Sequence, residues 1–440
     1  ALDANTTGVE NTAVGNSALT NNTTGQHNAA FGHDALELNT TGTNNTAIGE
    51  QAMEANTTGG NNTACGEAAL HANTTADNNT AVGQFALLSN TTGGFCVAVG
   101  ANALDANTTA NNNVAVGYNA LTANTTGTTN VGIGTAALQA NTTADNNTAV
   151  GHGTLESNTT GTQNVAVGAL ALDANTTADN NTAIGHNSLT ANTTGDNNNA
   201  VGQGTLTANT TGSNNTALGR ASLNVNTTAS NNTGVGYFAL AANTTGTRLT
   251  GLGSNALLNT TADDNTGCGA TALFTNTSGV KNTAVGSQAM YYNETGGSNT
   301  GVGYDVLQDN TTGSNNSALG AFALDNNTTG SSNTAVGRAA LDSNTTAGNN
   351  TAVGRQALQA NTTGASNTAV GAYAADAITT GVNHVAIGKN ANTTSTTGSS
   401  NIVIGENAQP SSSTVSQEIT LGNQHITAIR CNVQTISSLS

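Results

Sequence analysis

The chain of 440 residues is poor in charge, in aromatic side chains and in proline. Its 7 Lys and Arg against 24 Asp and Glu give a formal net charge of −17, which excludes a nucleic-acid backbone as partner. With no Trp, one Pro and 3% aromatic residues, the composition is not that of a globular domain. No apolar run approaches the about 18 residues of a membrane-spanning helix, so no membrane insertion is expected. The first residue is Ala1 rather than Met, which predicts a processed or truncated chain.

Glycine, asparagine and threonine are abundant instead, and they recur with a fixed period. We take the glycine that ends each phrase such as "TAVG" as the marker of one repeat. The markers run from Gly15 to Gly253 in steps of 17, and one step of 16 leads to Gly269. The missing residue falls between Leu257 and Asn259, and steps of 17 then resume. About 25 copies fill nearly the whole chain, which predicts a repeat architecture.

The columns of this repeat predict short β-strands. The residue before the marker is apolar from Val14 to Leu421, and the residue before that is nearly always Ala or Gly. The fourth residue after the marker is Leu up to Leu358, except at Met53 and Met290. The strand-like alternation has a period of two, and a helical period of 3.6 is absent. We therefore expect an all-β parallel β-solenoid, or β-roll, of about 25 coils, with the Val and Leu columns inside.

The "NTTG" segment of each repeat predicts a turn. Asn hydrogen-bonds its own backbone and tolerates left-handed geometry, and Gly supplies positive φ. Stacked Asn side chains can also hydrogen-bond from coil to coil. The same letters match the acceptor pattern for N-glycosylation, for example at Asn22, Asn39 and Asn56. The structural turn is the favoured interpretation, because the repeat creates this pattern automatically.

The position directly after the marker varies most, which predicts an exposed face. It holds His33, His152 and His186, but two His two coils apart are too distant to share one metal ion, so no metal site is predicted. Four of the seven cations lie here among tyrosines, and such a ridge is typical of surfaces that recognise sugars or proteins. Ordinary surface variation is the alternative. With one residue of the final coils added, the receptor-binding candidates are Tyr118, Arg220, Tyr237, Tyr304, Arg338, Arg355, Tyr373 and Lys389.

No set of residues predicts catalysis. A Ser/His/Asp triad, paired carboxylates, a phosphate-binding loop and a calcium-binding repeat cannot be assembled, so we expect neither an enzyme nor a cofactor. Cys65 and Cys268 lie in the apolar column before the marker and are expected to be buried, while Cys96 and Cys431 lie elsewhere. No pair of them has the spacing of a metal site.

The end of the chain carries two family resemblances. The phrases "HVAIGKNA" (384–391) and "NIVIGENA" (401–408) resemble the head repeats of trimeric autotransporter adhesins, which are left-handed β-rolls that pack three chains side by side. The resemblance implies a homotrimer, in which the Ala and Gly column on the outer strand face would let the backbones approach. After Pro410, the stretch "EITLGNQHITAIRCNVQTISSLS" resembles the segment before the C-terminal intramolecular chaperone of bacteriophage tail fibres and endosialidase-type tailspikes.

This second resemblance implies a maturation step. In that family the precursor trimerises, cuts itself after a Ser and releases the chaperone, and Ser440 stands where the cut would fall. The family's cleavage also uses a Lys shortly beyond the cut, which the sequence does not include. A trimeric C-terminal nucleus would fix the alignment of three chains whose coils have nearly equivalent registers. The resemblance therefore implies the mature product of a longer precursor.

These observations predict three regions and a role. Residues 1–371 form regular repeats, residues 372–422 form degenerate adhesin-head-like coils, and residues 423–440 form a trimeric stem. We expect a homotrimeric fibre, most simply a bacteriophage tail fibre in the virion, that attaches to a glycan or protein of the host surface. A cellular surface adhesin or extracellular filament is the alternative. An ice-binding solenoid is a weaker one, because the Thr pairs lie in the turn beside Gly.

Overall fold

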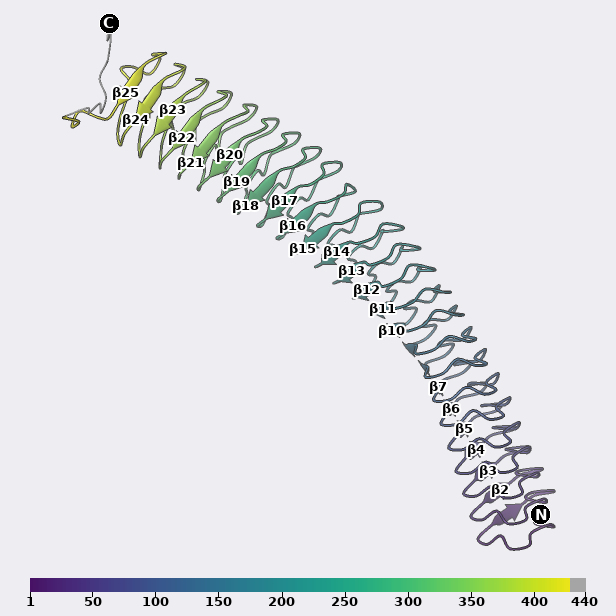
Figure 1. Ribbon diagram of the computed structural model, residues 1–440. Coiled ribbons are helices and arrows are strands. Elements are labelled where there is room, and N and C mark those ends of the chain that lie inside the picture. Colours follow the sequence, from purple (N-terminus) through teal and green to yellow (C-terminus); the bar gives the residue numbers. More distant parts are fainter. Residues whose placement is uncertain (428–440) are drawn as a thin grey trace, which may run out of the picture. The chain divides into compact units, whose positions relative to one another are not determined.

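In the computed structural model, which describes residues 1–427, the chain forms a parallel β-solenoid of short strands joined by turns (Figure 1). Each repeat contributes one strand of three residues, and the described residues contain no helix. The strands are β1 (Thr12–Val14), β2 (Ala29–Phe31), β3 (Thr46–Ile48), β4 (Thr63–Cys65), β5 (Thr80–Val82), β6 (Val97–Val99), β7 (Val114–Val116), β8 (Val131–Ile133), β9 (Thr148–Val150), β10 (Val165–Val167), β11 (Thr182–Ile184), β12 (Asn199–Val201), β13 (Thr216–Leu218), β14 (Thr233–Val235), β15 (Thr250–Leu252), β16 (Thr266–Cys268), β17 (Thr283–Val285), β18 (Thr300–Val302), β19 (Ser317–Leu319), β20 (Thr334–Val336), β21 (Thr351–Val353), β22 (Thr368–Val370), β23 (Val385–Ile387), β24 (Ile402–Ile404) and β25 (Ile419–Leu421).

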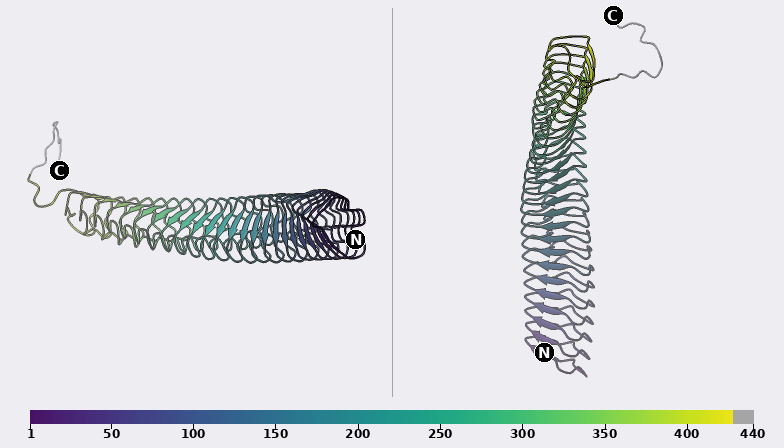
Figure 2. Two further views of the ribbon diagram at one scale, coloured as in Figure 1. Left: turned by 90° about the horizontal axis from the view of Figure 1, so that it is seen from below. Right: turned by 90° about the vertical axis from the view of Figure 1, so that its left-hand side faces the viewer.

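The solenoid consists of two compact units, Ala1–Thr247 and Arg248–Ser440. Strands β1 to β14 belong to the first unit, and β15 to β25 belong to the second. Within each unit the coils stack one on another, and their strands lie together on one side of the stack (Figure 2). The expected all-β parallel solenoid is confirmed.

Strand pairing follows the repeat without a shift of register. In the first unit Thr12, Ala13 and Val14 of β1 pair with Ala29, Ala30 and Phe31 of β2, which are residues 17 positions later. In the second unit the shortened repeat keeps the same register, because Thr250 pairs with Thr266. Identical columns therefore stack as ladders along each unit.

The interior differs from the prediction at one column. The Leu column is fully buried, as expected, and so are Met53 and Met290. The apolar column before the marker is not buried: Val14 is 55% exposed and Ile48 is 44% exposed. The Ala column at the middle of each strand points inward instead, with 0% exposure at Ala47 and in most other coils. The prediction that the Val column is inside and the Ala column outside is wrong, although the Leu column was placed correctly.

The size of the interior explains which strand face is buried. A β-carbon added at Gly132, a middle strand position, would lie 3.3 Å from Cδ1 of Leu121, so the Leu column already fills this space. At Gly301 the added atom would lie 3.0 Å from Cε of Met290. Beside a leucine of the Leu column only a methyl group or a hydrogen fits at this position. Valine takes it once, at the buried Val403, where Asn392 and Gln409 stand in the Leu column. Alternation alone shows that each strand has two faces and not which one is buried. The limited volume beside the Leu column decides this, because only the face with the small Ala and Gly side chains fits there.

Tight corners in every coil use left-handed backbone at residues that the sequence did not single out. The buried Leu19 has φ of 51°, and Ser17 and Asn44, at two other columns, have φ of 55° and 59°. Because a left-handed residue other than Gly costs about 1 kcal/mol, burial of the leucines must offset this cost. Asn22 and Gly25 of the "NTTG" segment do not have positive φ, so the expectation of left-handed geometry there is wrong.

Two buried ladders of asparagine run through the turns. In the first ladder, Nδ2 of Asn39 donates to Oδ1 of Asn22 at 2.8 Å and to the carbonyl of Gly42 at 3.1 Å. In the second, the backbone N–H of Asn45 donates to Oδ1 of Asn28 at 3.0 Å. The two ladders satisfy buried polar groups from coil to coil, which favours an exact stacking of equal turns.

The shortened repeat interrupts the first ladder in the second unit. Thr260, not Asn259, takes the buried position of the ladder, since its N–H donates to the carbonyl of Leu257 as each ladder Asn does. The omitted residue therefore lies after Thr260 in the turn, and not between Leu257 and Asn259. The buried hydroxyl of Thr260 has no hydrogen-bond partner. The ladder resumes at Asn276, whose Nδ2 donates to the carbonyl of Gly279 at 2.8 Å.

Candidate functional site

The variable column after the marker is exposed, and its neighbours on successive coils touch one another. Tyr118, Tyr237 and Tyr304 are 55%, 46% and 50% exposed. In the first unit the guanidinium of Arg220 lies 5.8 Å from the ring centre of Tyr237. Tyr237 also meets Phe238 edge to face at 4.4 Å. The turn after each strand therefore brings the candidate residues of adjacent coils into contact, while Tyr118 stands apart from these pairs in the sequence.

The second unit gathers more of the candidates along the same edge. Tyr304 packs edge to face on Phe322 at 5.5 Å, and the guanidinium of Arg338 lies 6.0 Å from the Phe322 ring centre. Arg355 stacks over Tyr373 at 4.6 Å and donates a hydrogen bond to its hydroxyl. We call these five residues the aromatic–cation ridge. Sequence reasoning missed Phe322, whose signal was an aromatic residue one position beyond the variable column.

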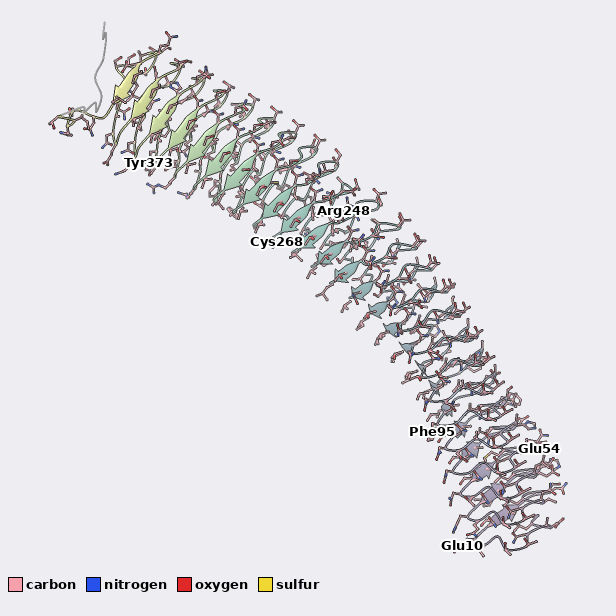
Figure 3. The ribbon with its side chains drawn as sticks, viewed as in Figure 1. Glu10, Glu54, Phe95, Arg248, Cys268 and Tyr373 are labelled. Carbon is pink, nitrogen blue, oxygen red and sulfur yellow. The ribbon has the colours of Figure 1, made fainter. Side chains whose placement is uncertain are left out.

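The ridge lies along the edge at which the strands end. Figure 3 shows Cys268 and Tyr373 on that edge of the second unit, whereas Arg248 lies toward the edge at which the strands begin. Arg248 forms an ion pair with Asp264, with Nε and Oδ1 2.5 Å apart, and its Nη2 lies 3.5 Å from Oδ2 of Asp263. Lys389, the last candidate, lies 3.6 Å from Glu406 in an exposed ion pair. Exposed pairs of this kind contribute little stability.

Acidic side chains lie beside the ridge, and burial changes their ionisation. The pKa of Asp325 is raised to about 7, first by burial and then by the charges of Asp342, Asp309 and Asp305. Oδ1 of Asp325 is buried without a hydrogen-bond partner. Burial also raises the pKa of Asp342. An aspartate with a pKa near neutrality carries only part of its charge at pH 7, which softens the repulsion between these acids.

A second aromatic group lies on another column of the second unit. Phe274 and Tyr291 stack face to face with ring centres 4.9 Å apart, and Tyr292 meets Tyr291 edge to face at 4.6 Å. Phe274 and Tyr291 follow the buried Leu or Met of their coils directly, at positions 17 apart. That spacing was the signal that sequence reasoning overlooked.

The outer strand face is the largest feature that the prediction placed elsewhere. In each three-residue strand the first and third side chains point outward, and neither column contains a charged residue from β1 to β25. Phe31, Leu218 and Leu319 of the third position are 41%, 46% and 52% exposed. Cys65 is exposed on this face and Cys268 is partly exposed, so the expectation that both are buried is wrong. The third position is apolar and the first is mostly Thr, so the two columns form an uncharged stripe, which we call the outer strand face.

The three asparagines considered for glycosylation lie in the first buried ladder. Asn22, Asn39 and Asn56 have 0% exposure. Nδ2 of Asn56 donates to Oδ1 of Asn39 at 2.8 Å and to the carbonyl of Gly59 at 3.0 Å. Nδ2 uses both of its N–H groups in these bonds, so a glycan on this buried nitrogen would break at least one of them in the folded coil.

The degenerate coils retain the fold with altered ladders. Ile378 and Ser395 occupy the first ladder fully buried, and His384 replaces Asn in the second. Nε2 of His384 lies 2.5 Å from the carbonyl oxygen of Gly398, while its Nδ1 is buried without a partner. Burial lowers the pKa of His384. The predicted cleavage position Ser440, and the stem beyond residue 427, lie outside the described residues.

Residues 1–427 contain no cluster of three or more His, Cys, Asp or Glu side chains arranged to hold a metal ion. The same part of the chain has no helix long and apolar enough to span a bilayer. The chain matches no protein-family model and no curated protein.

Proposed function

We propose that the chain is a structural fibre subunit that assembles as a homotrimer through its outer strand face and attaches to a host cell surface. The fibre is a bacteriophage tail fibre, as the C-terminal resemblance implies. The observation that carries the proposal is the outer strand face, which stays uncharged in every coil although the chain has a net charge of −17. Selection for solubility alone would not keep charge out of one stripe.

The area of this face supports self-association. With strands about 4.8 Å apart and about 10 Å long, the face covers about 600 Å² on the first unit and about 500 Å² on the second. A stable interface takes about 800 Å² from each partner, which neither unit supplies alone and the faces of the two units together exceed. Because the face repeats at every coil, copies aligned side by side would bury like columns against like columns.

Attachment is assigned to the aromatic–cation ridge and to the Arg220–Tyr237 pair. Exposed aromatic and arginine side chains are enriched among residues that dominate binding energy. They lie at the edge of the outer strand face rather than within it, so self-association leaves them accessible. The uncharged face and the charged ridge thereby divide assembly and recognition between different columns of one repeat.

Light scattering of the purified chain tests the assembly. We expect a mass three times the 43.1 kDa of one chain. Ile133→Lys, which places a charge on the outer face, should give a monomer, whereas Thr135→Lys, at the exposed variable column of the same coil, should remain trimeric. Cys65 offers an independent readout, since a short thiol crosslinker should join chains through it. A monomeric wild-type chain would overturn the homotrimer.

One observation favours a second candidate function, an ice-binding solenoid. Thr residues such as Thr46, Thr63 and Thr80 occupy the outward first position of successive strands, in addition to the Thr pairs of the turns. A regular array of hydroxyl and methyl groups on a strand face is a possible template for ordered water. Ice binding requires the face to be open, and the trimer covers it. Thermal hysteresis by a monomeric chain would therefore favour ice binding over the fibre.

A further inference from the structure

A polar groove of about 350 Å³ lies across three coils of the first unit, beside strands β11, β12 and β13. Its walls come from the turns that follow these strands, and six polar side chains line it. They are His186, Asn187, Gln203, Thr207, Arg220 and Asn224. The turns fold alike, so equivalent positions of successive coils face the groove together.

The groove exists because one coil lacks a side chain. Gly204 stands where the preceding coil has Asn187 and the following coil has Ala221. Its φ of 65° is close to the 56° of Asn187, so the backbone alone does not require glycine. A β-carbon placed on Gly204 would have only Oγ1 of Thr207, at 3.6 Å, within contact distance. The space above Gly204 is therefore open and forms the floor of the groove.

Two polar atoms of the walls have no partner within the protein. Oδ1 of Asn187 and Oδ1 of Asn224 are buried and accept no hydrogen bond. Leaving a buried acceptor unsatisfied is unfavourable, and native structures contain few such groups. Hydroxyl groups of a ligand in the groove would supply the missing donors after a small rotation of either amide.

The charge around the groove is unusual for this chain. Arg220 lies on its rim with its guanidinium 5.8 Å from the ring centre of Tyr237. The groove has no acidic lining residue, although the chain contains 24 Asp and Glu and only 7 Lys and Arg. The nearest acid before it in the equivalent turns is Asp173, and Asp305 is the next one after it. An unopposed guanidinium beside polar amides favours an anionic ligand that carries hydroxyl groups.

We propose that this groove binds a carboxylated sugar unit, with the carboxylate on Arg220 and sugar hydroxyls on Asn187 and Asn224. Tyr237 does not line the groove, but its ring lies against the guanidinium of Arg220 and helps to position it. The planar guanidinium suits a carboxylate because it donates two parallel hydrogen bonds. The proposal deepens the attachment role and rests on it, since it names the chemical class of receptor for one of the attachment residues.

Binding of defined oligosaccharides to the full chain tests the site. Probes are sialyllactose and trigalacturonic acid, with lactose and inorganic phosphate as controls for the neutral sugar and for a bare anion. We expect titration calorimetry or ligand-observed NMR to detect at least one carboxylated probe and neither control. Arg220→Gln should weaken that binding about tenfold or more, because a charge-assisted hydrogen-bond pair is lost.

A matched pair of glycine variants separates the groove from the fold. Gly204→Asn fills the floor with the residue that Asn187 already places at this left-handed position, so binding should be lost while the thermal midpoint stays unchanged. Gly153→Asn makes the same change at Gly153, which has φ of 60° and lies outside the groove, and binding should persist. The free ends of Leu170 and Glu156 near Gly153 can move aside.

The other possible outcomes all contradict the proposal that the groove binds a carboxylated sugar. Absence of binding by both carboxylated probes overturns the proposal, and so does binding that survives both Arg220→Gln and Gly204→Asn. Equal binding of phosphate would replace the sugar with a general anion site. None of these results bears on assembly. A trimer that adheres to host cells and does not bind the probes would support the proposed fibre role and contradict only the sugar site. A monomer that binds a probe would support the sugar site and contradict the trimeric fibre.

Discussion

Asn141 donates one hydrogen bond from Nδ2 to Oδ1 of Asn124, at 2.8 Å, and a second to the carbonyl of Ala144, at 3.1 Å. Its own Oδ1 accepts from Nδ2 of Asn158 at 3.0 Å. One buried side chain thus links three consecutive coils. Such a link is satisfied only if its neighbours keep the same register.

Replacement of this asparagine should therefore be costly. Asn141→Ala leaves Oδ1 of Asn124 buried without a partner and removes one of the two acceptors of Nδ2 of Asn158. We expect the free energy of unfolding to fall by about 1–3 kcal/mol. Thr143→Ala, at an exposed position of the same turn, should change it by less than about 0.5 kcal/mol. Denaturant unfolding followed by circular dichroism measures both. Equal effects would mean that the ladder is not a source of stability.

The volume of the interior predicts an asymmetry between neighbouring strand positions. Ala149→Val adds two methyl groups to the buried middle position of β9, and we expect a loss of about 1–3 kcal/mol. Thr148→Val changes the outward neighbour without adding volume inside, so the stability should stay within about 0.5 kcal/mol of wild type. Thermal unfolding compares the two. A tolerated Ala149→Val together with a damaging Thr148→Val would reverse the assignment of the faces.

His384 should make the second unit sensitive to acid. Because burial lowers its pKa below the ordinary 6.5, the folded state favours the neutral ring, and stability present above that value is lost as the pH falls through it. His384→Asn restores the residue of the ladder and removes the charge. We expect the gap in thermal midpoint between this variant and wild type to widen from pH 7.5 to pH 5. His152→Asn, at an exposed position, is the control for the exchange of His by Asn itself.

Asp325 should give stability the opposite pH dependence, with a loss as the pH rises. Its pKa is raised to about 7, so the stability that it contributes is present below about pH 4 and is lost as the pH rises through 7. Asp325→Asn should stabilise the second unit by about 1–2 kcal/mol at pH 8, allowing for solvent screening, and by almost nothing at pH 4. Thermal unfolding at both pH values tests this. A benefit that does not depend on pH would show that the carboxylate is not the cause.

Much of the fold could be predicted because the same sequence pattern recurs in about 25 coils, so a few atypical residues do not hide it. The period, the strands and the buried Leu column follow from patterns that recur in almost every coil. The direction of the strand faces could not be predicted, because Ala13 and Val14 alternate equally well either way and only the three-dimensional space beside the Leu column selects Ala. Left-handed leucines such as Leu19 contradict residue preference, and only the closed coil shows that they are needed.

The sequence predicted which column of the repeat holds the candidate residues. It did not predict which of those residues touch one another. The variable position identified Arg220 and Tyr237, but their stacking depends on how far side chains of adjacent coils can reach. The groove was not predictable, because it arises from a missing side chain at Gly204 in a sequence rich in glycine. Unpartnered amides at Asn187 and Asn224 likewise exist only in the folded molecule.

The in-register pairing of coils 17 residues apart means that the number of coils can change without disturbing the others. Because each coil contacts mainly its neighbours, loss or gain of one whole repeat leaves every remaining ladder intact. Each such change alters the length of the stack by about 4.8 Å. The number of repeats therefore sets the length of the stack without altering the contacts within the remaining coils.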